Sequence, residues 1–144
     1  MSKMLELYEI VKTCIPASIT PKFSYVETVK PGTKDKYEVI ENTAGIYFRP
    51  NMANKRDIAG NYLQESYRLL INLYTTRGET GIKNGIVICE EIVSKLDKIY
   101  NKSYSINGVG VYIANAERSQ SFGYVGPTDQ GVATFSINYL ITFS

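Results

Sequence analysis

The chemistry open to this chain is limited first by its side chains, because the sequence contains no histidine. Histidine is the only side chain whose unperturbed pKa lies near neutrality, and it is the commonest metal ligand in proteins. Its absence excludes Ser-His-Asp and Cys-His hydrolases, histidine-ligated zinc sites and histidine general bases. The two cysteines, Cys14 and Cys89, lie far apart within apolar helical patterns and lack CxxC spacing, so we expect core thiols in a reducing compartment.

Other motifs that carry chemistry are not indicated either. The sequence has no GxxxxGKS or GxxxxGKT phosphate loop. Gly108-Val109-Gly110 is followed by Val111, Tyr112 and Ile113, so the third glycine of a dinucleotide site and the helix that should follow it are missing. The carboxylates are scattered, and Glu90 and Glu91 are expected to point outward from a helix, which disfavours acid–base catalysis by paired carboxylates. We therefore expect a protein that is not an enzyme, with no catalytic residues, no cofactor and no metal site.

Hydrophobic periodicity predicts which elements hold these residues. The first apolar residues recur at helical spacing, and Pro16 ends that helix. A second run from Ile82 to Tyr100 predicts the strongest helix, and Gly81 and Gly85 at its start would allow close contact with a sheet. The predicted elements are helix 3–14, a weakly patterned strand within 23–29, strand 45–49 closed by Pro50, a polar loop 51–61, strand 62–75, helix 82–100, strand 108–116, a Gly- and Ser-rich loop 117–130 and strand 131–143.

These elements predict one α+β domain spanning residues 1–144, in which an antiparallel sheet of about four strands is packed by two helices. The composition, 44% hydrophobic and 21% charged, is that of a globular protein. The first residues lack the apolar core of a signal peptide, and no apolar run approaches the roughly 20 residues of a membrane helix. We therefore expect a soluble intracellular chain that contacts no membrane.

The predicted final strand carries no charge on either face. Among residues 119–144 the only ionisable side chain other than tyrosine is Asp129, whereas an antiparallel sheet open to water normally shows a polar and often charged face. One interpretation is a central strand with a mildly polar outer face, and the other is a second face covered by another subunit. Twelve tyrosines and no tryptophan favour a protein interface, and Tyr62 and Tyr74 fall on the polar side of their strand.

The order of elements and three segments point to one family. The segments are YLQESYRLLINLYT, which leads from the second long strand toward the helix, YVGPTDQG, and the terminal GVATFSINYLITF. Together with the layout of the whole chain, they resemble the tail terminator proteins of long-tailed bacteriophages. Some members of this family, from phages of Gram-positive bacteria, are labelled phage minor capsid proteins. The resemblance implies a tail-terminator-like α+β fold.

The resemblance also implies a structural virion protein without enzymatic activity. Such proteins form a homohexameric ring on the end of the tail tube, stop tube polymerisation and present the surface for head–tail joining. The expected partners are thus further copies of the chain, the tail tube protein and the head-completion or connector protein. The expected location is the head–tail junction of the virion, after assembly in the host cytoplasm. The net charge of +2 indicates no specific nucleic-acid binding, although DNA would pass through the ring lumen.

Interface residues follow from this resemblance. Loops 51–61 and 117–130 would face the tube or the head, since loops on a rigid scaffold commonly carry contacts. For the densest charge cluster, Lys55-Arg56-Asp57, the alternative interpretation is a solvated loop tip without a partner. The expected docking contacts are Lys55, Arg56, Asp57 and Arg118, and the residues expected to face the lumen or the next subunit are Tyr62, Arg68, Tyr74 and Asn138.

Two other functions fit the sequence. The first is another head–tail connector or tail component, or the corresponding cap of a phage-derived bacteriocin. The second belongs to a different class: a small-molecule binding module or histidine-free enzyme. Its pocket would lie on the polar sheet face, lined by Tyr62, Tyr74 and Tyr112 and closed by the predicted loop 117–130.

Overall fold

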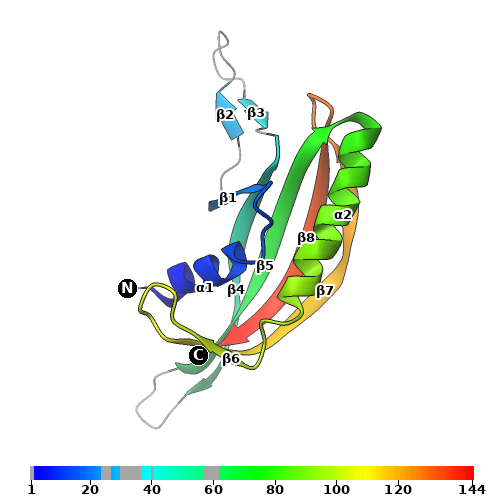
Figure 1. Ribbon diagram of the computed structural model, residues 1–144. Helices are drawn as coiled ribbons and strands as arrows, with labels where there is room; N and C mark the ends of the chain where they lie inside the picture. The colour runs from blue at the N-terminus through cyan, green and yellow to red at the C-terminus, as the bar shows by residue number, and fades with distance from the viewer. Residues whose placement is uncertain (1, 24–26, 30–36, 40, 57–61) are drawn as a thin grey trace.

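The computed structural model describes residues 2–23, 27–29, 37–39, 41–56 and 62–144 (Figure 1). Two helices and a set of strands follow one another along the chain. In chain order they are α1 (Lys3–Lys12), β1 (Thr20–Phe23), β2 (Glu27–Val29), β3 (Tyr37–Val39), β4 (Thr43–Arg56), β5 (Tyr62–Arg77), α2 (Gly78–Leu96), β6 (Lys102–Tyr104), β7 (Val111–Pro127) and β8 (Val132–Phe143).

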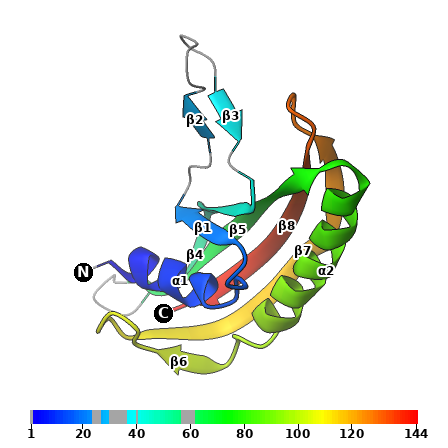
Figure 2. The ribbon, with the colours of Figure 1, turned by 45° about the horizontal axis from the view of Figure 1, so that its top comes forward.

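Six strands form one curled half-barrel sheet in the order β1-β4-β5-β8-β7-β6 (Figure 2). Strand β1 runs parallel to β4, and every other neighbouring pair is antiparallel. Strands β2 and β3 form a separate antiparallel ribbon. The predicted antiparallel sheet of about four strands packed by two helices is therefore wrong. The sheet is larger and mixed, because the short strands β1 and β6 extend it at both sides.

Helix α1 follows directly from its sequence. The Ser2 side chain accepts a hydrogen bond from the Met4 N–H at 3.1 Å, which satisfies one of the free donors at the helix start. Leu7, Ile10 and Val11 are fully buried on one side. The helix ends at Lys12, slightly earlier than predicted, and the chain continues in a turn toward Pro16.

Helix α2 lies close to the sheet because two of its residues are glycines. A Cβ atom at Gly85 would lie 2.0 Å from Cε2 of Phe135, and one at Gly81 would lie 2.0 Å from the carbonyl oxygen of Thr76. Larger residues could not occupy these positions without a shift of the helix or the sheet. The predicted close contact between this helix and the sheet is thus confirmed.

Both segments predicted as long loops are strand over most of the residues that the structure describes. Strand β4 continues through Pro50 as far as Arg56, and β7 continues through the segment predicted as loop 117–130 as far as Pro127. Pro50 is tolerated because β1 pairs with β4 only over residues 43–46, so among the described residues Pro50 has a neighbouring strand on one side only, and the ladder there does not need its missing N–H.

The second half of β7 has a loop-like composition for a related reason. Strand β6 pairs with β7 only over residues 111–113, so among the described residues the rest of β7 has β8 as its single neighbour. Residues 117–121 are accordingly exposed. Four register shifts interrupt the β7–β8 ladder, and Gly123 and Gly126 lie beside two of them. The polar and glycine-rich sequence of this segment therefore reflects an exposed, irregular edge strand instead of a loop.

Candidate functional site: the open face of the sheet

Both helices pack on the same side of the central sheet (Figure 2). Side chains of α1 and α2 share one buried cluster with alternate residues of β4, β5 and β8. On β5 and β8 the members of this cluster are 1% exposed or less: Leu69, Ile71, Leu73, Phe135, Ile137, Tyr139, Ile141 and Phe143. We call this side the covered face, and none of the described elements packs against the other side.

The other side, which we call the open face, is defined by the strand register. Antiparallel partners project to the same side, so the side chains form rows across β4, β5, β8 and β7. One row holds Arg49, Arg68, Leu140 and Glu117, and the next holds Tyr47, Leu70, Asn138 and Gln120. The open face further includes Asn72, Tyr74, Thr134, Ser136 and Thr142.

Most of the open face is uncharged. Ser66 and Thr142 share a hydrogen bond of 3.1 Å between their hydroxyl groups, and Asn138 Nδ2 donates to Ser136 Oγ at 3.1 Å. The outward residues of β8 are half-buried even though no described element covers them. The alternating pattern predicted for the final strand is confirmed, including the absence of charge on its outer face.

Three charged residues of one row interrupt this neutral surface: Arg49, Arg68 and Glu117. Arg49 of β4 and Arg68 of β5 are directly opposite each other in the register, and both are exposed. Like charges directly opposite each other in a sheet destabilise it. Neither arginine forms an ion pair with another residue that the structure describes. The two arginines therefore lie side by side without a described ion-pair partner, and Leu140 separates them from Glu117 in the same row.

Three of the predicted interface residues lie together on the open face. Arg68 and Tyr74 project from β5, and Asn138 lies on β8 opposite Leu70, between them along the sheet. Sequence reasoning named these three but missed Arg49. The signal was present, because Arg49 lies two residues from Tyr47 in a strand with period-two alternation, but its register against β5 could not be read from the sequence.

The predicted docking loop is not a loop where the structure describes it. Lys55 and Arg56 end strand β4, and their register partners are Gln64 and Tyr62 at the start of β5. The structure describes the backbone but not the side chains of Lys55, Arg56 and Tyr62, and Asp57 lies outside the described residues. Their roles as docking or lumen contacts stay predictions.

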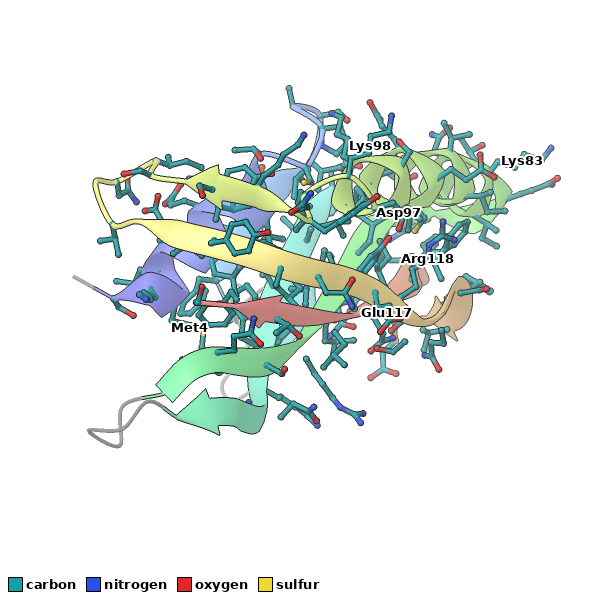
Figure 3. The ribbon with its side chains drawn as sticks, turned by 90° about the horizontal axis from the view of Figure 1, so that it is seen from below. Met4, Lys83, Asp97, Lys98, Glu117 and Arg118 are labelled. Atoms are coloured by element: carbon teal, nitrogen blue, oxygen red, sulfur yellow. The ribbon has the colours of Figure 1, made fainter. Side chains whose placement is uncertain are left out.

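Arg118 occupies a different position from the one predicted. It lies on β7 opposite Tyr139, on the covered side, and forms an ion pair with Asp97 just beyond the end of α2 (Figure 3). Arg118 Nε donates to Asp97 Oδ1 at 3.1 Å, and the buried Tyr139 hydroxyl donates to the same oxygen at 2.5 Å. Hydrogen bonds from Arg118 lower the pKa of Asp97, and burial raises the pKa of Tyr139. This cluster links α2 to β7 and β8, and the role of Arg118 as a docking contact stays a prediction.

Glu6 is a polar residue whose role the sequence analysis missed. Its side chain is 1% exposed, and its carboxylate accepts hydrogen bonds from the backbone N–H groups of Ile106 and Asn107, the latter at 2.9 Å. Glu6 therefore holds the segment between β6 and β7 against α1. Its burial could have been predicted from its position one helical turn before Ile10, which places it on the apolar side of the helix.

Two of the three tyrosines expected to line the alternative pocket, Tyr74 and Tyr112, lie at opposite ends of the sheet. The Tyr112 hydroxyl on β7 donates a hydrogen bond to Asn101 Oδ1 at 2.6 Å, beside β6. Tyr74 lies near the end of β5 that leads into α2. The segment expected to close the pocket is mostly β7. Among the described residues, one surface depression of about 320 Å³ is lined by Ser2, Leu5, Glu6, Asn107 and Val109. Another, of about 300 Å³, is lined by Ser18, Asn42, Thr75, Thr76, Asn84, Val87 and Ile88.

The two thiols are buried and unpaired with each other, as predicted for core cysteines. Burial raises the pKa of both, that of Cys89 to about 12, so both remain protonated at neutral pH. Within the described part of the chain, no three His, Cys, Asp or Glu side chains are grouped to hold a metal ion. Neither of the two described helices has the length and apolar character needed to cross a membrane.

No family model matches this sequence, and no curated protein matches it either.

Proposed function

We propose that this protein is a structural component of a phage tail, a tail terminator that assembles as a ring on the end of the tail tube. The observation that carries the proposal is the open face: a long sheet surface that no described element covers, with half-buried and uncharged residues along β8 at its centre. A sheet face that remains in water normally carries more charge. Neutral hydroxyl and amide groups with two leucines suit a surface that another protein covers.

The covering protein is, in this proposal, another copy of the same chain. The open face and the helix-bearing side are different surfaces on opposite sides of the sheet. A contact between two different surfaces is heterologous, and repeated copies then close into a ring when the rotation between neighbours allows it. The sequence resemblance to tail terminators supplies the expected ring order of six, the position at the head–tail junction and the partners, which are the tail tube protein and the head-completion protein.

The decisive experiment measures assembly and capping separately. Light scattering gives the mass of the purified protein alone and after mixing with phage tail tubes, and negative-stain images show the tube ends. A sixfold ring and capped tubes that no longer elongate are the expected results. A monomer that neither assembles nor caps tubes would contradict the proposal, and a ring of another order that binds a head protein alone would indicate a different connector.

A further inference from the structure

Helix α2 exposes apolar and acidic side chains on the side that points away from its own sheet. Ile86 and Val87 are 41% and 64% exposed. Glu90 and Glu91 follow one turn later, and both are exposed. Neither carboxylate forms an ion pair with another described residue. We call these four residues the α2 patch.

The open face carries apolar and basic side chains that complement the α2 patch. Leu140 is the register partner of Arg68, and Leu70 lies two residues along β5 from that arginine. The two leucines are half-buried, and the adjoining pair Arg49 and Arg68 is exposed and has no described counter-ion. On the sheet, the leucines adjoin the arginine pair on one side and Glu117 of β7 on the other. On the helix, Ile86 and Val87 adjoin Glu90 and Glu91 on one side and Lys83, one turn earlier, on the other.

The spacing of the two surfaces also agrees. Residues one helical turn apart are separated by about 5.4 Å along the axis. Residues on the same face of a strand are separated by about 6.7 Å. A helix that places Val87 on Leu70 and Leu140 can therefore bring Glu90 and Glu91 within reach of the two long arginine side chains. Arginine suits this contact because its planar guanidinium group binds carboxylates in a bidentate manner.

We propose that the α2 patch of one copy packs on the open face of the next copy, with Glu90 and Glu91 facing Arg49 and Arg68. This inference rests on the proposed ring, since it names the surfaces that join neighbouring copies. Each copy gives its helix to one neighbour and receives the helix of the other. The sheet then lies between two layers of helix, and the repulsion between the two arginines is relieved by carboxylates.

Charge reversal on each surface tests the contact. The sheet variant carries Arg49→Glu and Arg68→Glu, and the helix variant carries Glu90→Lys and Glu91→Lys. Each variant alone places like charges across every contact, so its self-association should weaken at least tenfold in sedimentation velocity. An equal mixture should reassemble, because in an alternating ring every contact again joins opposite charges. A chain with all four substitutions should also assemble.

A matched control separates this effect from a general change of charge. Lys3 and Lys102 are exposed on α1 and β6, outside both surfaces. The variant Lys3→Glu with Lys102→Glu changes the net charge as much as the sheet variant does and should assemble like the unmodified protein. Thermal unfolding of every variant at low concentration shows whether the monomer fold is retained.

Three results would overturn the contact: an unmodified protein that stays monomeric, reversed variants that assemble normally, or a mixture that fails to restore assembly. Tube capping is scored independently. Rings that obey the charge reversal but cap no tail tube would contradict the proposed function and leave the contact standing. Rings that cap tubes but ignore the charge reversal would contradict the contact alone.

Discussion

The two faces of the central sheet are built from the same strands and differ in what they bury. Leu69 and Leu70 are consecutive in β5, yet Leu69 is 1% exposed against the helices whereas Leu70 is half-buried on the open face. Because side chains alternate along a strand, each strand contributes to both surfaces. One face therefore holds the monomer together, and the other is the face on which we propose that copies associate.

The largest expected effect comes from truncating the two neighbouring leucines. Leu69→Ala removes a side chain from the closed core and should lower the free energy of unfolding by about 2–5 kcal/mol. Leu70→Ala should lower it by less than about 1 kcal/mol in the monomer, while it weakens self-association. Urea denaturation at a concentration where the protein is monomeric measures both values. Equal losses for the two variants would mean that the faces do not differ as described.

A second test adds an atom where the helix meets the covered face. Gly85→Ala places a Cβ atom against the Phe135 ring and should cost about 1–3 kcal/mol of stability. Gly123→Ala is the control, because β7 leaves open space there, and its effect should be near zero. Thermal unfolding compares the two variants, and an unchanged melting temperature for Gly85→Ala would show that α2 does not lie this close to the sheet.

The third test concerns Glu6, whose buried carboxylate is tolerated on the covered side because it accepts backbone hydrogen bonds. Glu6→Ala leaves the N–H groups of Ile106 and Asn107 without their acceptor and should cost about 1–3 kcal/mol. Glu9→Ala, on the same helix, loses only a 3.9 Å ion pair with Lys12 and should change stability by less than about 0.5 kcal/mol. Chemical denaturation of both variants is the measurement. A loss for Glu9→Ala as large as that for Glu6→Ala would contradict the assigned role.

The smallest effect is a pH dependence at the edge of the covered face. Arg118 lowers the folded-state pKa of Asp97, so this carboxylate contributes stability above its unfolded pKa, near 3.9, and the contribution is lost as pH falls through the lower folded pKa. The contribution should be at most about 1 kcal/mol because the pair is partly exposed. Asp97→Asn should therefore flatten the fall in melting temperature below pH 4. Glu91→Gln serves as the exposed control, and identical acid profiles for Asp97→Asn and the unmodified protein would exclude the effect.

The sequence predicted the elements with long, regular patterns. Strands β5 and β8 and helix α2 each contain enough periods for the apolar side to be identified. Strands β1 and β6 have four and three residues, which is too short for a period-two pattern. The ends of β4 and β7 were misread because proline, glycine and serine are typical of loops, and at a sheet edge they are also tolerated in strands.

The candidate site was predictable only in part. Alternation along β5 predicts that Arg68 and Tyr74, six residues apart, share its polar face. Alternation along β8 predicts that Asn138 lies on the uncharged face of that strand. The pairing of Arg49 with Arg68 depends on the register between two strands, which periodicity does not determine. The ion pair between Arg118 and Asp97 depends on how α2 crosses β7. This is a tertiary contact that no local sequence pattern predicts.

The register shifts along β7 have a consequence for how copies can meet. An exposed strand edge is a template on which further chains add their own strands, and such growth has no natural end. In β7 four shifts, with glycines beside two of them, break the edge into short pieces that cannot pair along their length with a straight strand. Open-ended, amyloid-like stacking of edges is thereby disfavoured, and association is directed to faces, where the number of copies is set by geometry.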